Sequence, residues 1–323
     1  MNKLRFFIGL FFILLSFTVG AQNESDSVNY RPEISIDTRF GYYHDLTNNN
    51  GSFVGDQLYL DVAGDITSNL SYSLNYRLFS YYDDVTTFAD RINWLNLSYQ
   101  VGDFTFTAGK DCIMLGSFEY DQYDLDAYYI MNSIVYNMSS AWQWGIYATW
   151  AITDSQIIIF QFANSPMSDG FSSLFSYNLA WRGEWNMYES YWSANLWEYD
   201  SGKFVKSLNF GNRFNFGDFS MEVDYLNSAV SMGSLFSEEV TIMATPSYSI
   251  GERFRVFMKL GWEKSSGIFD EEFIGENLFY GAGVEFFPIK EKENLRLHLI
   301  WGGNNNYTSN NTISAGITWK IKL

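Results

Sequence analysis

Residues that could carry catalytic chemistry are few in this sequence, and they form no catalytic pattern. The chain has one cysteine, Cys112, and two histidines, His44 and His298. Nucleophilic hydrolysis needs a serine or cysteine beside a base, and no G-x-S-x-G motif occurs. The lone cysteine excludes a disulfide scaffold, and the three residues together are too few for an ordinary zinc site. We therefore expect no catalytic residue, no metal and no cofactor, and we interpret Cys112 as unreactive.

One acidic segment offers chemistry of another kind. The segment from Cys112 to Ala141 contains Glu119, Asp121, Asp124 and Asp126, has no Lys or Arg, and is rich in aromatic and aliphatic side chains. Because a loop in water does not need these rings, we expect it to pack against the rest of the protein. One alternative is an extracellular flap with a solvated acidic face. Another is a calcium site, although the spacing matches no known calcium loop.

Most of the chain has a hydrophobic period of two, which is typical of β-strands. In residues 70–78, for example, Leu and Tyr alternate with Ser, Asn and Arg. Each segment is roughly ten residues long, as membrane-spanning strands require, and there are about sixteen of them. Their expected spans are 33–43, 55–65, 69–82, 90–101, 104–111, 142–152, 156–164, 176–186, 190–199, 203–216, 219–228, 240–250, 253–263, 277–287, 294–303 and 311–323.

The connections between these segments alternate between short turns and longer polar loops, such as His44 to Val54 and Cys112 to Ala141. Short turns at one end and long loops at the other are typical of outer-membrane barrels. Aromatic residues make up 20% of the chain and gather near strand ends, where a membrane interface favours them. A soluble sandwich or lectin is the alternative, but so many strands would present more apolar surface than one core can bury. The sequence predicts an all-β, transmembrane antiparallel barrel with the long third loop folded into its lumen.

The N-terminus predicts export. Residues 1–21 have a basic start, a short apolar run and a small-residue cleavage site, which together indicate a signal peptide; a retained membrane anchor is the alternative. Residues 22–32 are expected to be a short polar periplasmic tail, and residues 33–323 the barrel in the outer membrane of a Gram-negative cell. The formal net charge is −17, so nucleic acid is not expected as a partner.

A barrel of about sixteen strands encloses a water-filled channel. Strand parity predicts which basic residues line its wall: Arg39, Arg77, Arg182, Arg213, Arg253, Arg255, Lys259 and Arg296. With the third loop inside, the constriction would be formed by Lys110, Glu119, Asp121, Asp124 and Asp126. Carboxylates opposite arginines would create a transverse field there. The alternative is that these charges are only solvated, or paired across neighbouring strands.

Three short stretches resemble a known family. Residues 94–99 (WLNLSY), 107–110 (TAGK) and 116–121 (GSFEYD) are similar to the porins of Bacteroidetes, which are distantly similar to the phosphate-selective porin family. The resemblance implies a sixteen-stranded trimeric channel in which the strand ending in A-G-K leads into the pore-folded loop. Phosphate selectivity is not implied, because in the family it rests on a dense arginine ladder and constriction lysines, whereas this loop is acidic.

The expected function is passive diffusion of ions and small hydrophilic solutes through a loop-constricted channel that prefers cations or neutral solutes. The expected partners are outer-membrane lipid, these solutes and, from the resemblance, two further copies in a homotrimer. Three alternatives stay open. They are an anion or phosphate porin, a closed structural or adhesive barrel, and, least favoured, an outer-membrane enzyme.

Overall fold

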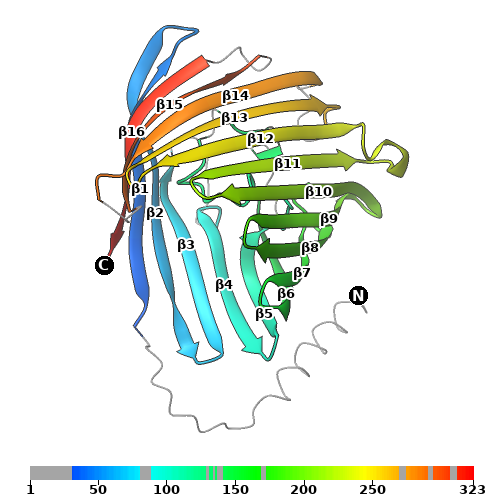
Figure 1. The fold of residues 1–323 in the computed structure, drawn as a ribbon. Helices are drawn as coiled ribbons and strands as arrows, with labels where there is room; N and C mark the ends of the chain where they lie inside the picture. Colours follow the sequence, from blue (N-terminus) through cyan, green and yellow to red (C-terminus); the bar gives the residue numbers. More distant parts are fainter. Residues whose placement is uncertain are drawn as a thin grey trace.

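A computed structural model describes residues 31–80, 89–128, 131–133, 135–136, 141–168, 172–268, 274–289, 294–305 and 311–323. The expected signal peptide, and the tail up to residue 30, lie outside the described residues. The strands form one closed antiparallel barrel in which each strand pairs with its neighbours in the chain and β1 pairs with β16 (Figure 1). The strands are β1 (Glu33–Asp45), β2 (Asn50–Thr67), β3 (Leu70–Ser80), β4 (Ile92–Val101), β5 (Phe104–Cys112), β6 (Trp142–Thr153), β7 (Gln156–Asn164), β8 (Phe175–Trp185), β9 (Tyr188–Asp200), β10 (Lys203–Phe216), β11 (Phe219–Ala229), β12 (Glu239–Ile250), β13 (Phe254–Ser265), β14 (Gly275–Phe286), β15 (Leu295–Asn304) and β16 (Asn311–Lys322).

The sixteen-stranded antiparallel barrel predicted from the alternation is confirmed. The expected long loop from His44 to Val54 is wrong, because β1 and β2 extend through it and are joined by a tight turn. The Asp45 carboxylate accepts hydrogen bonds from the Asn48 side chain and backbone, which lower its pKa, and Asn49 has a φ of 52°. These local bonds stabilise a turn that hydrophobic periodicity does not reveal.

Alternation places apolar side chains outside and polar side chains inside. On β15, Leu297, Leu299 and Trp301 are exposed on the outer surface, whereas Arg296 and His298 are buried inside. The outer surface therefore has the apolar character that a lipid environment requires. Among the described residues, no helix is long and apolar enough to cross a membrane.

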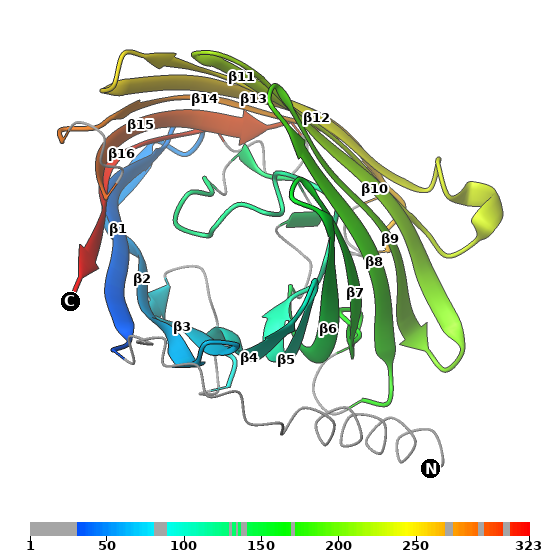
Figure 2. The same ribbon diagram turned by 60° about the horizontal axis from the view of Figure 1, so that its bottom comes forward.

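The connection between β5 and β6 lies inside the ring of strands (Figure 2). Its residues Ile113, Leu115 and Val135 pack against inward-facing side chains of the wall, including Trp197 and Phe279. A barrel this wide does not fill its own interior. The main hydrophobic core therefore lies where this connection meets the inner wall.

One glycine of β5 is required by close backbone contact. Gly109 has a φ of 144°, and a Cβ there would lie 2.1 Å from the carbonyl oxygen of Leu95 on β4. We expect Gly109→Ala to lower the free energy of unfolding by about 1–3 kcal/mol or more, through backbone strain and overlap. Urea unfolding in vesicles, followed by tryptophan fluorescence, measures this. Gly55→Ala is the control, since its Cβ would meet nothing nearer than a Phe79 ring atom at 3.8 Å. Equal losses in the two variants would contradict the expectation.

Candidate functional site

The segment 113–141, called the inner loop below, begins by following the inner wall. Gln161 of β7 binds the backbone where β5 passes into this loop. Its amide nitrogen donates to the carbonyl oxygen of Cys112 at 2.8 Å, and its amide oxygen accepts from the Met114 backbone N–H at 3.0 Å. The Gly116 N–H then donates to the hydroxyl of Ser193 on β9 at 2.8 Å. These bonds satisfy loop backbone groups that would otherwise be buried without partners.

Asp224 of β11 holds the next part of the inner loop. Its carboxylate accepts from the Ser117 hydroxyl at 2.9 Å and from the backbone N–H groups of Phe118 at 3.0 Å and Glu119 at 2.9 Å. Asp224 is buried. Three converging donors on one buried carboxylate stabilise a single loop conformation, because leaving these groups unpaired would be costly.

Glu119 is buried and forms an ion pair with Lys259 of β13. The Lys259 ammonium lies 2.6 Å from a Glu119 carboxylate oxygen, and the two side chains are only 4% and 2% exposed. Lys259 also donates to the side-chain oxygen of Asn132 at 2.8 Å, and the Ser133 N–H donates to Glu119 at 2.9 Å. Glu119 and Lys259 thus connect two parts of the inner loop, around residue 119 and around residues 132–133, to β13. The charge of Glu119 does not face the open lumen.

The far limb of the inner loop lies against β1 and β15. The Arg39 guanidinium of β1 donates to the carbonyl oxygens of Leu125 at 2.9 Å and Ala127 at 2.8 Å. Arg296 of β15 donates to Leu125 at 2.9 Å and pairs with Asp126. Both predicted wall arginines therefore face inward, where they bind loop backbone as well as carboxylates.

Two buried carboxylates pair with these arginines. Strand alternation predicts the inward position of one of them and not of the other. Asp56 of β2, fully buried, forms an ion pair with Arg39. The β1–β2 register shifts beside Arg39, so a bulge turns Asp56 inward against the parity of Asp61. Glu285 of β14, which parity alone places inside, lies 3.5 Å from the Arg296 guanidinium, pairs also with Arg255 and accepts from the Tyr128 hydroxyl at 2.7 Å. A bulge leaves no signal in the alternation, which is why sequence analysis misses Asp56.

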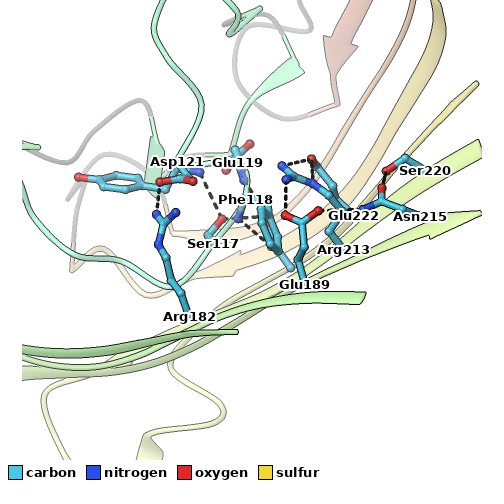
Figure 3. Close-up of polar contacts among 12 residues, drawn as sticks. Ser117, Phe118, Glu119, Asp121, Arg182, Glu189, Arg213, Asn215, Ser220 and Glu222 are labelled. Atoms are coloured by element: carbon cyan, nitrogen blue, oxygen red, sulfur yellow. Dashed lines mark hydrogen bonds and ion pairs between the residues drawn. The ribbon is translucent and has the colours of Figure 1, made fainter. Parts of the chain in front are cut away.

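A cluster of partly exposed charges of both signs lies around Phe118 (Figure 3). Asp121 pairs with Arg182 of β8, and the two side chains are 37% and 34% exposed. Arg213 of β10 lies 4.1 Å from the Phe118 ring centroid and pairs at 2.8 Å with both Glu189 and Glu222. A solute that passes this point meets partly exposed ion pairs of both signs.

On the opposite side of the lumen, the inner loop reaches β2 and β3. The hydroxyl of Tyr59 on β2 donates to the Asp124 carboxylate at 3.0 Å. The hydroxyl of Tyr123 donates to Asp61 of β2 at 3.3 Å and accepts from the Asn75 amide of β3 at 3.1 Å. The loop therefore crosses the lumen between its contacts with β11 and β13 and those with β2 and β3.

A calcium site in the inner loop would need its three aspartates close together, but their side chains point apart. Asp121 binds Arg182 of β8, Asp124 accepts from Tyr59 of β2, and Asp126 binds Arg296 of β15. In the described part of the chain, no group of three or more His, Cys, Asp or Glu side chains could hold a metal ion. The aspartates hold the loop at three places on the wall.

Two predicted site residues lie elsewhere. Lys110 is opposite the outward-facing Leu95, and its ammonium donates at 3.1 Å to the Ala89 carbonyl in the β3–β4 connection. The next residue, Asp111, takes the inner face and accepts from Asn96 at 2.7 Å, so alternation directs Lys110 away from the constriction. Arg253 lies exposed in the β12–β13 turn, because β13 begins only at Phe254.

Arg77 lies inside, as parity predicts, where it donates to the side-chain oxygen of Asn93 on β4 at 2.6 Å.

The comparisons with known proteins agree with this architecture. Residues 28–185, slightly under half of the chain, match the family described as phosphate-selective porin O and P. A mutant of the Rh. blastica porin is similar over 90% of this chain and 100% of its own, with a TM-score of 0.64 and 11% identity. The chain has the porin fold.

Two other solved porins share the fold at similarly low identity. OmpT of Vibrio cholerae in its trimer form has a TM-score of 0.64 and 12% identity, over 90% of this chain and 99% of its own. The anion-selective porin from Comamonas acidovorans has a TM-score of 0.62 and 10% identity over the same shares. The curated proteins contain no significant match.

Proposed function

We propose that this protein is an outer-membrane porin through which ions and small hydrophilic solutes diffuse passively, with the inner loop setting the aperture. One observation carries the proposal: the loop binds opposite sides of a wide barrel, at Asp224 and Lys259 on one side and at Tyr59 and Arg39 on the other. A segment that crosses the lumen narrows the channel and leaves the barrel wall unchanged. The porin fold and the family match support a channel in place of an enzyme.

We propose that the channel has a weak preference for cations over anions. The loop carboxylates of Glu119, Asp121 and Asp126 each pair with a basic wall residue. Asp111 instead accepts hydrogen bonds from neutral donors such as Asn96, so it adds negative charge to the β4–β6 side. Such a field favours cations over anions and admits neutral solutes.

An anion-preferring porin is the second candidate. It is supported by three partly exposed guanidinium groups on the other side of the lumen, those of Arg182, Arg213 and Arg255. The porin from Comamonas acidovorans, which shares the fold, is described as anion-selective. A homotrimer is also proposed, because OmpT of Vibrio cholerae has a trimer form. Export by residues 1–21 and a periplasmic tail up to residue 32 stay predictions.

Planar-bilayer recording tests the function and its charge preference together. The folded protein should give steady current steps, with a reversal potential on the cation side under a salt gradient. Asp121→Asn with Asp126→Asn should remove the negative charges opposite Arg182 and Arg296 and lower the cation-to-anion permeability ratio by at least about twofold, because fixed pore charges focus counter-ions.

Asp200→Asn is the matched control, since Asp200 pairs with Lys203 at the exposed β9–β10 turn. It should leave the ratio unchanged. If the folded barrel gives no current, the protein is a closed barrel. An unchanged ratio in the double variant would remove the loop aspartates from the selectivity mechanism.

A further inference from the structure

An apolar groove crosses the outer surface of the barrel from β5 to β10. Strand pairing aligns its floor, because one outward-facing residue of each strand lies opposite the next across six strands. This row is Phe106, Ala148, Phe160, Leu179, Ala194 and Leu208. The two alanines lower the surface between larger neighbours. The groove has a volume of about 740 Å³.

Larger residues border the floor on both sides. The row on the short-turn side contains Trp150, Trp181 and Trp192, and the last two rings lie 5.0 Å apart. The row on the long-loop side contains Tyr177 and Leu196 and continues in register to Lys206 of β10. The groove therefore has a basic residue at its long-loop end.

The β11–β12 loop covers that end. In Figure 2 this loop extends outward from the wall beside β10, and its residues Met232 and Leu235 line the groove. The ammonium of Lys206 donates to the Val230 carbonyl at 2.6 Å, and that of Lys264 on β13 donates to the Ser237 carbonyl at 3.0 Å. The loop is thus held on both flanks, and the groove beneath it is preformed.

We propose that this groove binds the acyl chains of a phosphorylated lipid of the outer leaflet, with the lipid phosphate at Lys206. The volume is in the range of small-ligand sites, about 300–1,000 Å³, and the apolar lining suits acyl chains. The floor faces lipid, since Phe106, Phe160 and Leu179 are exposed outer-surface residues. Long loops of such barrels are extracellular, which places Lys206 at the level of outer-leaflet headgroups.

The charge of Lys206 distinguishes this site from the rest of the apolar belt. Its hydrogen bonds among the described residues go to the carbonyl oxygens of Phe204 and Val230, and neither partner is a carboxylate. A lysine whose stem lies along apolar surface and whose charged head reaches the interface is suited to an anionic headgroup. One lipid molecule then places its phosphate at Lys206 and its acyl chains in the groove. Bulk lipid around the barrel needs no such pairing of a charged contact with an apolar one.

Native mass spectrometry of the folded protein in detergent, titrated with bisphosphorylated lipid A, tests the site. Ala194→Trp fills the floor and should weaken lipid retention at least tenfold; Ala315→Trp on the outer face of β16 is the matched control and should not. Ala148→Trp fills the same floor from β6, and serves if the first variant does not fold. Lys206→Gln should remove the preference for bisphosphorylated over dephosphorylated lipid A, whereas Lys203→Gln at the same rim should preserve it.

Equal retention by the groove-filling variants and the β16 control would overturn the proposal. So would an unchanged phosphate preference in Lys206→Gln. If Ala194→Trp instead separates an oligomer into monomers, the groove belongs to an interface between copies and not to lipid. Bilayer conductance of Ala194→Trp should equal that of the unsubstituted protein, so failure of the lipid site is separate from failure of the porin function.

Discussion

Asp224→Ala is expected to raise the mean single-channel conductance by about half or more and to increase current fluctuations, while the barrel stays folded. The substitution removes the acceptor of three inner-loop donors, from Ser117, Phe118 and Glu119. Leaving buried donors unpaired costs about 1–3 kcal/mol each. The segment that crosses the lumen beyond Glu119 then loses its fixed position, and the aperture varies in size.

Asp224→Asn is the matched control, because an amide keeps one acceptor oxygen and should give an intermediate noise level. Limited proteolysis provides a second measurement. Residues 111–181 contain no Lys or Arg, so chymotrypsin, which cuts after aromatic residues, is the informative protease. Asp224→Ala should be cut in the loop faster than Asp224→Asn. Identical conductance, noise and cleavage in all three proteins would show that this carboxylate does not position the loop.

Lys259→Met is expected to destabilise the inner loop most strongly. It leaves the Glu119 carboxylate buried without its cation, and breaking a buried pair from one side costs about 3–5 kcal/mol. The variant should unfold at lower urea concentration, or should release the loop and become sensitive to chymotrypsin before the barrel unfolds. Urea titration with both readouts separates the two outcomes.

The double variant Glu119→Gln with Lys259→Met tests the cause. It removes the buried carboxylate charge together with its cation, so it should recover most of the resistance to urea and to chymotrypsin that Lys259→Met loses. Lys203→Met is the matched control, since Lys203 pairs with Asp200 on the exposed surface and should change little. If the double variant is no better than Lys259→Met alone, the loss comes from packing and not from an uncompensated charge.

The charged residues of the lumen hold the inner loop in position, in addition to any effect on ion selectivity. Two of the arginines that parity places on the wall, Arg39 and Arg296, bind the inner loop through its carbonyl oxygens. Those that keep partial exposure, such as Arg182, do so while paired with a carboxylate. A selectivity change on mutation therefore needs a parallel check of loop position, which the chymotrypsin assay supplies.

The barrel itself could be predicted from the sequence because its cause is local and repeated. A period of two assigns each residue to one face, and it does so independently on every strand, so β7 and β10 have the bounds that alternation predicts. The position of the long acidic connection follows from the same pattern. Its apolar side chains predict packing against the wall, as Ile113 and Leu115 show.

The site depended on contacts that no local pattern contains. Glu119 meets Lys259 across 140 positions of sequence, and Asp224 meets Ser117 across 107. Closure of the barrel and the register of each strand decide which wall residue faces which part of the loop. A one-residue bulge brings Asp56 inside, and the alternation at Asp111 turns Lys110 out. Sequence by itself determined the strands and, where no bulge intervenes, the face that alternation gives their residues. Only the tertiary structure decided where bulges fall and which charges meet, because pairing depends on register and on distances across the closed barrel.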